Sequence, residues 1–160
     1  MANTSDMEFG QINVTVDNRS GYIVDLESVS KTAAEVLAQL DAGPGEISLV
    51  FVTPAEMAGL NLKHMGRKGI TDVLAFPLDA GDKNSAGTRI GAGAVPVLLG
   101  DVVICPQAAE QQARALGASL AEEMCLLLIH GILHIAGFDH ETDSGQMEAR
   151  QTELVAQICR

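Results

Sequence analysis

The segment 120–135 is predicted to form a helix with apolar side chains around almost its whole circumference. Its start is marked by Ser119 and Glu122, which have the spacing of a capping box, an exchange of hydrogen bonds that satisfies free backbone N–H groups. A helix that is apolar all round is buried, because every side of it must be kept from water. We therefore expect this helix to lie at the centre of the fold, enclosed by strands and other helices.

Predicted strands and further helices occupy most of the remaining chain. Alternating polarity, or short apolar runs between turn residues, predicts strands at 11–17, 46–52, 72–76 and 97–104. Start and stop signals predict helices at 28–40, from Thr53 and Pro54 to the glycines at 66–69, at 106–117 and from about 143 to the C-terminus. Thr32 and Glu35 also have capping-box spacing, which offers a later start for the first of these helices. The expected architecture is α+β, with helices packed on a small mixed sheet of about four strands around the central buried helix.

Length and composition predict one domain, residues 1–160, with an aliphatic core. Residues 1–10 are expected to be a flexible tail, and 79–94, rich in Gly and Asp, a flexible loop. Aromatic residues make up only 3% of the chain and Trp is absent, so Leu, Ile, Val, Ala and Met must fill the core. No apolar run reaches the roughly 18 residues of a membrane span, and the N-terminus lacks the pattern of a secretory signal. We expect a soluble cytoplasmic protein with no membrane partner.

The three cysteines, Cys105, Cys125 and Cys159, are widely spaced and form no Cys-x-x-Cys pair. Their odd number argues against a disulfide framework, and their spacing argues against thiolate metal ligands. Cys125 and Cys159 fall in apolar helical patterns, so we expect both to be buried free thiols.

Three of the four histidines in the chain fall between positions 130 and 140. His130 and His134 are four positions apart, so they project from one face of the predicted helix. Gly137 can end that helix in the left-handed conformation, after which the chain can bring His140 back to the same point. Three imidazoles and a water make a tetrahedral site with one open position, which is typical of catalytic zinc. We predict one zinc ion per chain, held by these three side chains.

The spacing of the three histidines matches that of metzincin proteases, so the predicted site is zincin-like. In metzincins the residue after the first histidine is a Glu that acts as general base, and this chain has Gly131 there. The missing carboxylate argues against peptide hydrolysis. Zinc can still lower the pKa of its water to about 7 and supply hydroxide, which leaves other hydrolytic reactions open.

The segment 130–140, HGILHIAGFDH, resembles the signature of the YbeY family of bacterial rRNA maturation endoribonucleases. Further matches, in the same order along the chain, are Leu60-Asn61, the segment 71–77 (TDVLAFP) and the segment 99–104 (LGDVVI). The resemblance covers the chain from about residue 46 to its end. It implies a metal-dependent endoribonuclease specific for single-stranded RNA, which acts on the 3′ end of the small-subunit rRNA and in ribosome quality control. The implied partners are an rRNA precursor and ribosomal or assembly proteins.

The same resemblance implies that the three histidines are the metal ligands, and it draws attention to two departures from the family pattern. Many members have an Arg at the position of Met65, where it assists catalysis or phosphate binding. Arg67 lies two positions further on and is the candidate for that role. The Ser of the family's Leu-Ser-Phe-Pro segment is Ala75 here, so no hydroxyl at that position can be essential.

Four other polar residues each have a functional and a structural interpretation. Asp139 precedes a ligand and either orients an imidazole or the water, or is an ordinary turn residue. Lys68, like Arg67 beside it, either contacts phosphate or belongs to a solvated loop. Asp72 is expected at a strand start, where it caps the loop, with a role in the site as the alternative. His64 is expected to be exposed and not a ligand.

The net charge of −11 counts against tight, non-specific nucleic-acid binding, although 63–68 is a local basic cluster. Two alternatives to the ribonuclease therefore stay open. One is a zinc metallopeptidase or another hydrolase of small substrates. The other is a non-catalytic ribosome-assembly factor with a structural zinc. The acidic balance favours the second a little, because a ribonuclease should present positive potential to its substrate.

Overall fold

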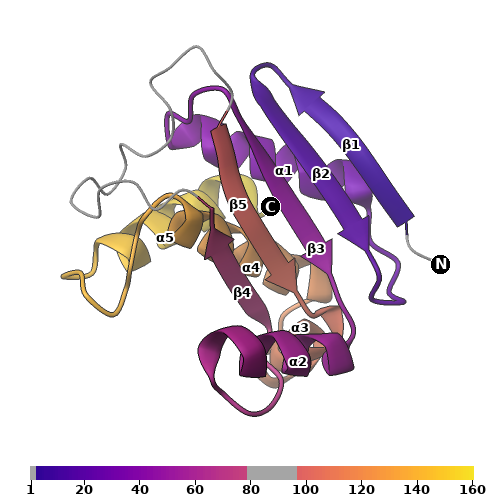
Figure 1. Cartoon of the computed structure of the whole chain (residues 1–160). Helices are drawn as coiled ribbons and strands as arrows, with labels where there is room; N and C mark the ends of the chain where they lie inside the picture. Colours follow the sequence, from indigo (N-terminus) through magenta and orange to yellow (C-terminus); the bar gives the residue numbers. More distant parts are fainter. Residues whose placement is uncertain (1–2, 79–96) are drawn as a thin grey trace.

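The computed structural model describes residues 3–78 and 97–160 (Figure 1). The strands are β1 (Asn3–Phe9), β2 (Ile12–Asn18), β3 (Gly45–Phe51), β4 (Val73–Pro77) and β5 (Val97–Ile104). The helices are α1 (Leu26–Gln39), α2 (Pro54–Met65), α3 (Pro106–Leu116), α4 (Leu120–Ile135) and α5 (Gln146–Ile158). From residue 11 onward, every predicted strand and helix is present, with bounds that differ by a few residues.

The strands form one mixed sheet in the order β1-β2-β3-β5-β4. The central strands β2, β3 and β5 are parallel, while β1 and β4 run antiparallel at the two edges. In Figure 1, α1, α4 and α5 lie behind the sheet, and α2 lies at the end of the sheet where β3 and β5 finish. The predicted α+β architecture, with helices on a mixed sheet, is confirmed.

Helix α4 lies inside the helical layer, in contact with β4, β5, α1, α3 and α5. Its fully buried large side chains are Leu128, Ile129, Ile132 and Leu133. Phe51 is the only aromatic residue among the buried core residues of the described chain, so the expected aliphatic core is confirmed. No single described helix has the length and hydropathy of a membrane span, which only α3 and α4 reach as a pair bent by 115°.

Helix α4 approaches the sheet most closely at Gly131. A Cβ atom at this position would lie 2.5 Å from Cγ1 of Val102 on β5, a side chain with no exposed surface. The helix can therefore pack directly on β5 only because Gly131 has no side chain. This gives a steric reason for glycine at the position where metzincins carry their Glu.

Replacing Gly131 by Ala is expected to lower the free energy of unfolding by about 1–2 kcal/mol. Overpacking a core costs about 1–3 kcal/mol, and the better helix propensity of Ala offsets up to about 1 kcal/mol. Urea denaturation measures the difference. The same change in a Val102→Ala background should be neutral or stabilising, because the clashing methyl groups are gone. An equal loss in both backgrounds would contradict the steric explanation.

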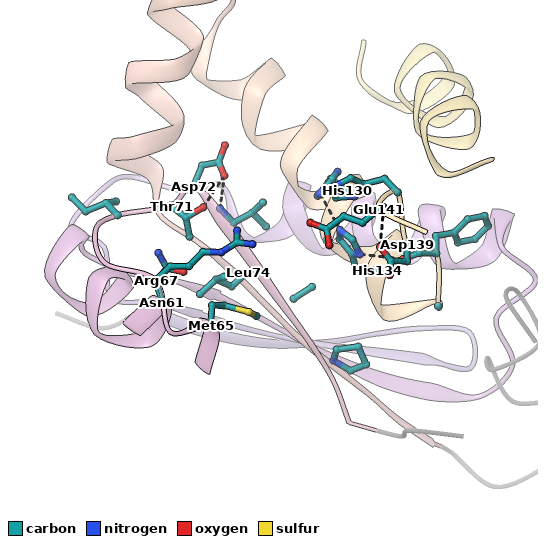
Figure 2. A pocket seen from close by; sticks show the side chains of 18 of the residues that line it. Asn61, Met65, Arg67, Thr71, Asp72, Leu74, His130, His134, Asp139 and Glu141 are labelled. Atoms are coloured by element: carbon teal, nitrogen blue, oxygen red, sulfur yellow. Dashed lines mark hydrogen bonds between the residues drawn. The ribbon is translucent and has the colours of Figure 1, made fainter. Parts of the chain in front are cut away.

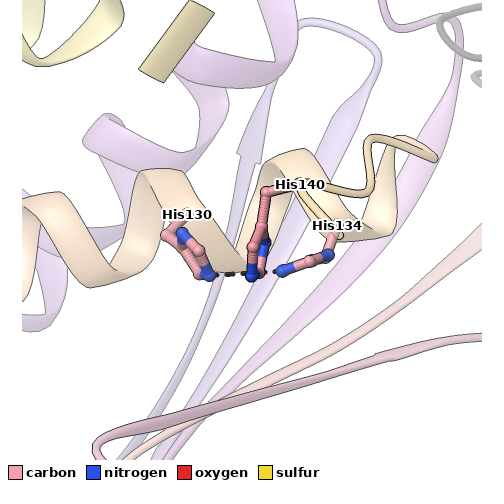
Figure 3. Close-up of side chains that lie close together, drawn as sticks. All are labelled: His130, His134 and His140. Carbon is pink, nitrogen blue, oxygen red and sulfur yellow. Dashed lines mark hydrogen bonds between the residues drawn. The ribbon is translucent and has the colours of Figure 1, made fainter. Parts of the chain in front are cut away.

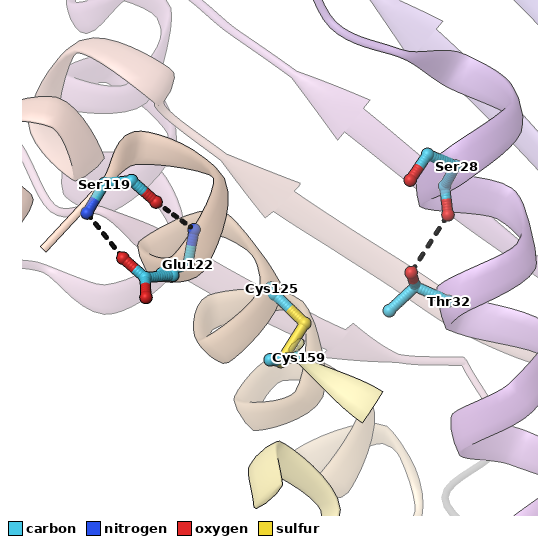
Figure 4. Close-up of a disulfide and its surroundings, with 6 residues drawn as sticks. All are labelled: Ser28, Thr32, Ser119, Glu122, Cys125 and Cys159. Atoms are coloured by element: carbon cyan, nitrogen blue, oxygen red, sulfur yellow. Dashed lines mark hydrogen bonds between the residues drawn. A yellow bond between two sulfur atoms is a disulfide. The ribbon is translucent and has the colours of Figure 1, made fainter. Parts of the chain in front are cut away.

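The starts of α1 and α4 show where possible N-cap residues in the sequence do and do not begin a helix. Helix α1 begins after Asp25, whose side chain accepts a hydrogen bond from the N–H of Ser28 at 3.0 Å. Thr32 lies inside the helix and donates to the carbonyl oxygen of Ser28, so the later start at Thr32 and Glu35 is wrong (Figure 4). Asp and Thr are both common N-cap residues, and spacing alone could not separate them. Helix α4 begins with the predicted capping box (Figure 4).

The N-terminal residues 1–10, predicted as a flexible tail, contain the strand β1. It pairs antiparallel with β2 across a turn at Gly10. All of its side chains are exposed or half-buried, so backbone pairing largely holds it, and a polar–apolar alternation over residues 6–9 alone is too short to predict the strand. The sheet therefore has five described strands rather than about four. The flexible loop predicted at 79–94 lies outside the described residues.

The expectation that Cys125 and Cys159 are free thiols is wrong, because they form a disulfide (Figure 4). The bond joins the middle of α4 to the residue that follows α5, with the two Cα atoms 5.9 Å apart. The partners are 34 positions apart and meet only because α5 packs against α4, which no local pattern reveals. Cys105 is a free, buried cysteine.

Candidate metal centre

Three histidine side chains converge at the C-terminal end of α4 (Figure 3). His130 and His134 project from one face of the helix, and their Nε2 atoms are 3.2 Å apart. The helix ends at Ile135 with Ala136 as its C-cap, and Gly137 has a φ of 100°, a left-handed conformation that reverses the chain. The reversal brings in His140, so that one ring nitrogen of each histidine lies within 4.8 Å of the others. The structure thus brings together the three side chains whose spacing predicts convergence.

The two helical imidazoles are each held through the outer ring nitrogen. Nδ1 of His130 lies 2.8 Å from Oε1 of Gln151 on α5, and Nδ1 of His134 lies 3.1 Å from the carbonyl oxygen of Phe138. Both partners are acceptors, so each Nδ1 carries the proton and donates it. The Nε2 lone pairs are therefore left to face a common centre, as in histidines that ligate metals.

Burial holds the pKa of His134 below its usual value, and the neighbouring His130 and His140 lower it further when they are charged. The hydrogen bond to the carbonyl of Phe138 and the charge of Asp139 raise the pKa by smaller amounts. The net effect keeps the imidazole neutral near pH 7. Neutral imidazole is the form that binds a metal.

Three imidazoles fit a divalent first-row metal that keeps an open coordination position. Among the described residues, this is the one group of three or more potential ligands that lie close enough together, and no carboxylate or thiolate belongs to it. Structural zinc sites usually have four protein ligands, so this donor set fits a reactive centre better. One of the three side chains, His140, is exposed, which leaves the centre open to a substrate.

The histidine cluster forms one wall of an open pocket of about 770 Å³ (Figure 2). This wall consists of α4 and the residues 137–141 that follow it. The opposite wall consists of the end of α2, the loop 66–72 and β4. Arg67 and Asp139, the two residues predicted to be catalytic, both line the pocket, as do Lys68 and Asp72. Two segments distant in sequence thus contribute to one cavity.

The loop with the two cationic residues is fastened to α2 by Asn61. Nδ2 of Asn61 donates to the carbonyl oxygen of Gly69 at 3.0 Å, and the backbone N–H of Arg67 donates to the carbonyl oxygen of Asn61 at 3.4 Å. Asn61 is only 6% exposed. Within the described part of the chain, neither Arg67 nor Lys68 forms an ion pair, so both charges are available to a phosphate.

The two aspartates of the pocket stabilise local backbone. Oδ1 of Asp139 accepts a hydrogen bond from the N–H of Glu141 at 3.0 Å, and its carbonyl oxygen accepts two further N–H groups of the same turn. Asp139 therefore shapes the turn that carries the third histidine. Oδ1 of Asp72 accepts from the N–H of Val73 at 2.8 Å, the capping contact expected at a strand start.

His64 lies apart from the cluster, since its ring packs 4.9 Å from that of Phe76 and it does not line the pocket. The sequence did not predict the roles of two residues, Gln151, which orients His130, and Asn61, which holds the loop 66–72. The contact of Gln151 depends on how α5 packs against α4, and a polar residue on an amphipathic helix gives no sign of it. The only indication of a role for Asn61 in the sequence is that Leu60-Asn61 is one of the segments that resemble the family.

The family profile and the curated relatives name one and the same family. The family profile described as Endoribonuclease YbeY matches residues 13–159. A Salinispora tropica protein named Endoribonuclease YbeY is 40% identical over 149 residues, which cover 91% of this chain and 95% of that protein. A protein of the same name from Mycolicibacterium smegmatis is 37% identical over 147 residues, 90% of this chain and 82% of that protein. The solution structure of TM1509 from Thermotoga maritima shares the fold, with a TM-score of 0.56 and 24% identity over 92% of this chain and 88% of that one.

Proposed function

This chain belongs to the YbeY family, and we propose that it is a metal-dependent endoribonuclease that cuts single-stranded RNA, with residues 1–160 as one hydrolase domain. One observation carries the proposal: three converging imidazoles and two cationic side chains, which form no ion pair among the described residues, lie on opposite walls of a single pocket. The names of the relatives supply the class of reaction and substrate. The geometry supplies the place where that reaction can occur.

The proposed metal is zinc, one ion per chain, held by His130, His134 and His140. Zinc prefers nitrogen ligands in tetrahedral geometry, and three protein ligands leave the open position of a catalytic site. When bound, it supplies Lewis acidity at a phosphoryl oxygen and helps to activate the attacking oxygen.

The side chains of the protein bind and orient the substrate. Arg67 and Lys68, across the pocket from the histidines, bind the phosphodiester and offset the negative charge that develops on it. Gln151 and the carbonyl of Phe138 hold two imidazoles in one tautomer. Asp139 is proposed as a positioning residue, because it holds the turn before the third histidine.

The proposed substrate is a precursor of ribosomal RNA, at the 3′ end of the small-subunit RNA, and the proposed place of action is the cytoplasm. Ribosomal or assembly proteins are the proposed partners. The net charge of −11 supports a need for them, since an acidic chain gains little non-specific affinity for RNA. Partner proteins on a ribosomal particle can provide the positive potential that this chain lacks.

The two alternative functions each lack support in the site. A metallopeptidase of the metzincin type needs a carboxylate at position 131, where a Cβ atom would already clash with Val102. An assembly factor with structural zinc would be expected to offer four protein ligands, and the cluster in the described residues offers three.

The test of the proposed function is cleavage of a short precursor-rRNA fragment, free and annealed to its complement. We expect cleavage of the single strand and protection of the duplex, and no cleavage of casein. Cleavage of casein with no cleavage of either RNA would favour the peptidase and overturn the proposal.

Replacing Gln151 by Leu is expected to weaken zinc binding by about 10–100-fold, because His130 loses the acceptor that fixes its tautomer and ring orientation. Competition with a chromophoric chelator measures the affinity. Gln151→Glu keeps an acceptor for the same N–H and should bind zinc within a few-fold of the wild type. Glu148→Gln, on the same helix but outside this contact, is the control. Equal zinc affinity in Gln151→Leu and wild type would show that Gln151 does not position the ligand.

A further inference from the structure

Strand β4 is an edge strand whose outer side faces the metal pocket. It pairs with β5 on its inner side, and no other described strand pairs with it (Figure 1). Four of its five residues, Val73, Leu74, Ala75 and Pro77, line the pocket together with the histidines. The pocket therefore has an open sheet edge along the wall opposite its metal centre.

Two backbone hydrogen bonds fix which groups point outward. The N–H of Cys105 donates to the carbonyl oxygen of Asp72 at 2.9 Å, and the N–H of Leu78 donates to the carbonyl oxygen of Leu99 at 3.2 Å. In an antiparallel ladder, residues that bond to the partner strand alternate with residues that face away from it. Residues 72, 74, 76 and 78 therefore face β5, and residues 73, 75 and 77 turn their N–H and C=O groups outward. Pro77 fits this register, since an edge strand tolerates proline where the N–H would face solvent.

Only one of the three outward positions offers a free donor. The N–H of Val73 is bound by Oδ1 of Asp72 at 2.8 Å, and Pro77 has no N–H. The N–H of Ala75 has no hydrogen-bond partner among the described residues. The carbonyls of Val73, Ala75 and Pro77 also face outward, and that of Val73 lies next to this N–H, so the edge presents a single donor with an acceptor beside it.

A nucleobase is the ligand that matches one donor beside one acceptor. The Watson–Crick edge of every base carries a donor group next to an acceptor group, and proteins read these edges in unpaired RNA. An extended peptide would instead need several free N–H groups along the strand, and β4 has one. Resting on the proposed function, we infer that the outer edge of β4 binds the Watson–Crick edge of an unpaired base beside the scissile phosphate.

This placement explains how the site would select single strands. In a duplex the Watson–Crick edges are occupied by the complementary strand, so no base can reach Ala75. The rest of the pocket suits a nucleotide as well. Met65 and Ile70 line it and are 45% and 55% exposed, which provides apolar surface for a base, and Arg67 and Lys68 provide charge for its phosphate.

The test is the variant Ala75→Pro, which removes the free N–H and no bond of the β4–β5 ladder. The KM for a single-stranded fragment is expected to rise about 5–10-fold, which is the loss of affinity expected when one hydrogen bond is removed. The kcat should stay within about twofold of the wild-type value. Zinc content and Tm should match the wild type. Ala75→Ser keeps the N–H and is the conservative variant, so its KM should rise less than that of Ala75→Pro.

A second arm uses the substrate. A fragment that is abasic at one nucleotide beside the cleavage site should raise KM for the wild type by at least the same factor, because the apolar contacts of the base are lost as well, and Ala75→Pro should add no further loss. An unchanged KM for the abasic fragment with wild-type protein would overturn the inference, even if Ala75→Pro fails to fold. Additive losses would also overturn it, because they place the N–H and the base in separate interactions. Failure of the proposed function would look different. In that case the wild-type protein would cleave neither the intact nor the abasic fragment, whereas failure of the inference about β4 alone would leave cleavage of the intact fragment in place.

Discussion

The variant His134→Ala is expected to lose its metal and at least about 10³-fold of its RNA cleavage. His134 supplies one of only three imidazoles in the cluster, and its Nε2 lies 3.2 Å from that of His130. Two remaining histidines cannot hold zinc at the affinity of three, and Lewis-acid stabilisation of a phosphoryl oxygen is worth several kcal/mol. The measurements are zinc per chain after dialysis and the rate of cleavage of a single-stranded rRNA fragment.

The matched control is His64→Ala, which removes the one histidine outside the cluster. Its ring packs against Phe76 and does not line the pocket, so zinc content and cleavage should both stay near wild-type values. His134→Ala should also keep its circular dichroism spectrum, since the imidazole faces the pocket. Full cleavage by a folded, metal-free His134→Ala protein would show that the cluster is not the reaction centre.

The second large effect is expected for Arg67→Ala, a fall of about 10²-fold in kcat. Arg67 lies in the loop opposite the histidines, and no ion pair neutralises it within the described residues. Removal of one group that stabilises developing charge commonly costs 10²–10³-fold in kcat. Steady-state kinetics on the single-stranded fragment measures the change, and zinc content should not move.

Two matched variants distinguish a specific role of Arg67 from an effect of the net charge of the protein. Lys63→Ala removes an equal charge from α2 at an exposed position that does not line the pocket, and its kcat should stay within about twofold of the wild type. Arg67→Lys keeps the charge but not the planar fork, so it should recover part of the rate. Equal losses in Lys63→Ala and Arg67→Ala would mean that only the overall charge matters.

Local signals predicted most of the fold and the centre of the site. The histidine spacing and Gly137 predicted the convergence, because both depend on the geometry of one helix and one turn. The apolar circumference of 120–135 predicted the buried helix, and its capping box predicted where that helix begins. Each of these patterns is complete within a short stretch of chain.

Features that depend on packing between distant segments could not be predicted in this way. The disulfide between Cys125 and Cys159 and the contact from Gln151 to His130 both exist because α5 lies against α4. Strand β1 is held at the sheet edge largely by backbone pairing, and the polar–apolar alternation of its side chains is confined to residues 6–9. The open edge at Ala75 follows from sheet order, which the strands alone do not specify.

The central claim is that RNA cleavage depends on one zinc ion held by three histidines. The most direct measurement is a titration of chelator-stripped, folded wild-type protein with zinc, in which bound metal and cleavage of the single-stranded fragment are followed together. We expect no cleavage without metal, then a linear rise that ends at one zinc per chain. Full cleavage by the stripped protein, with no response to added zinc, would contradict the claim.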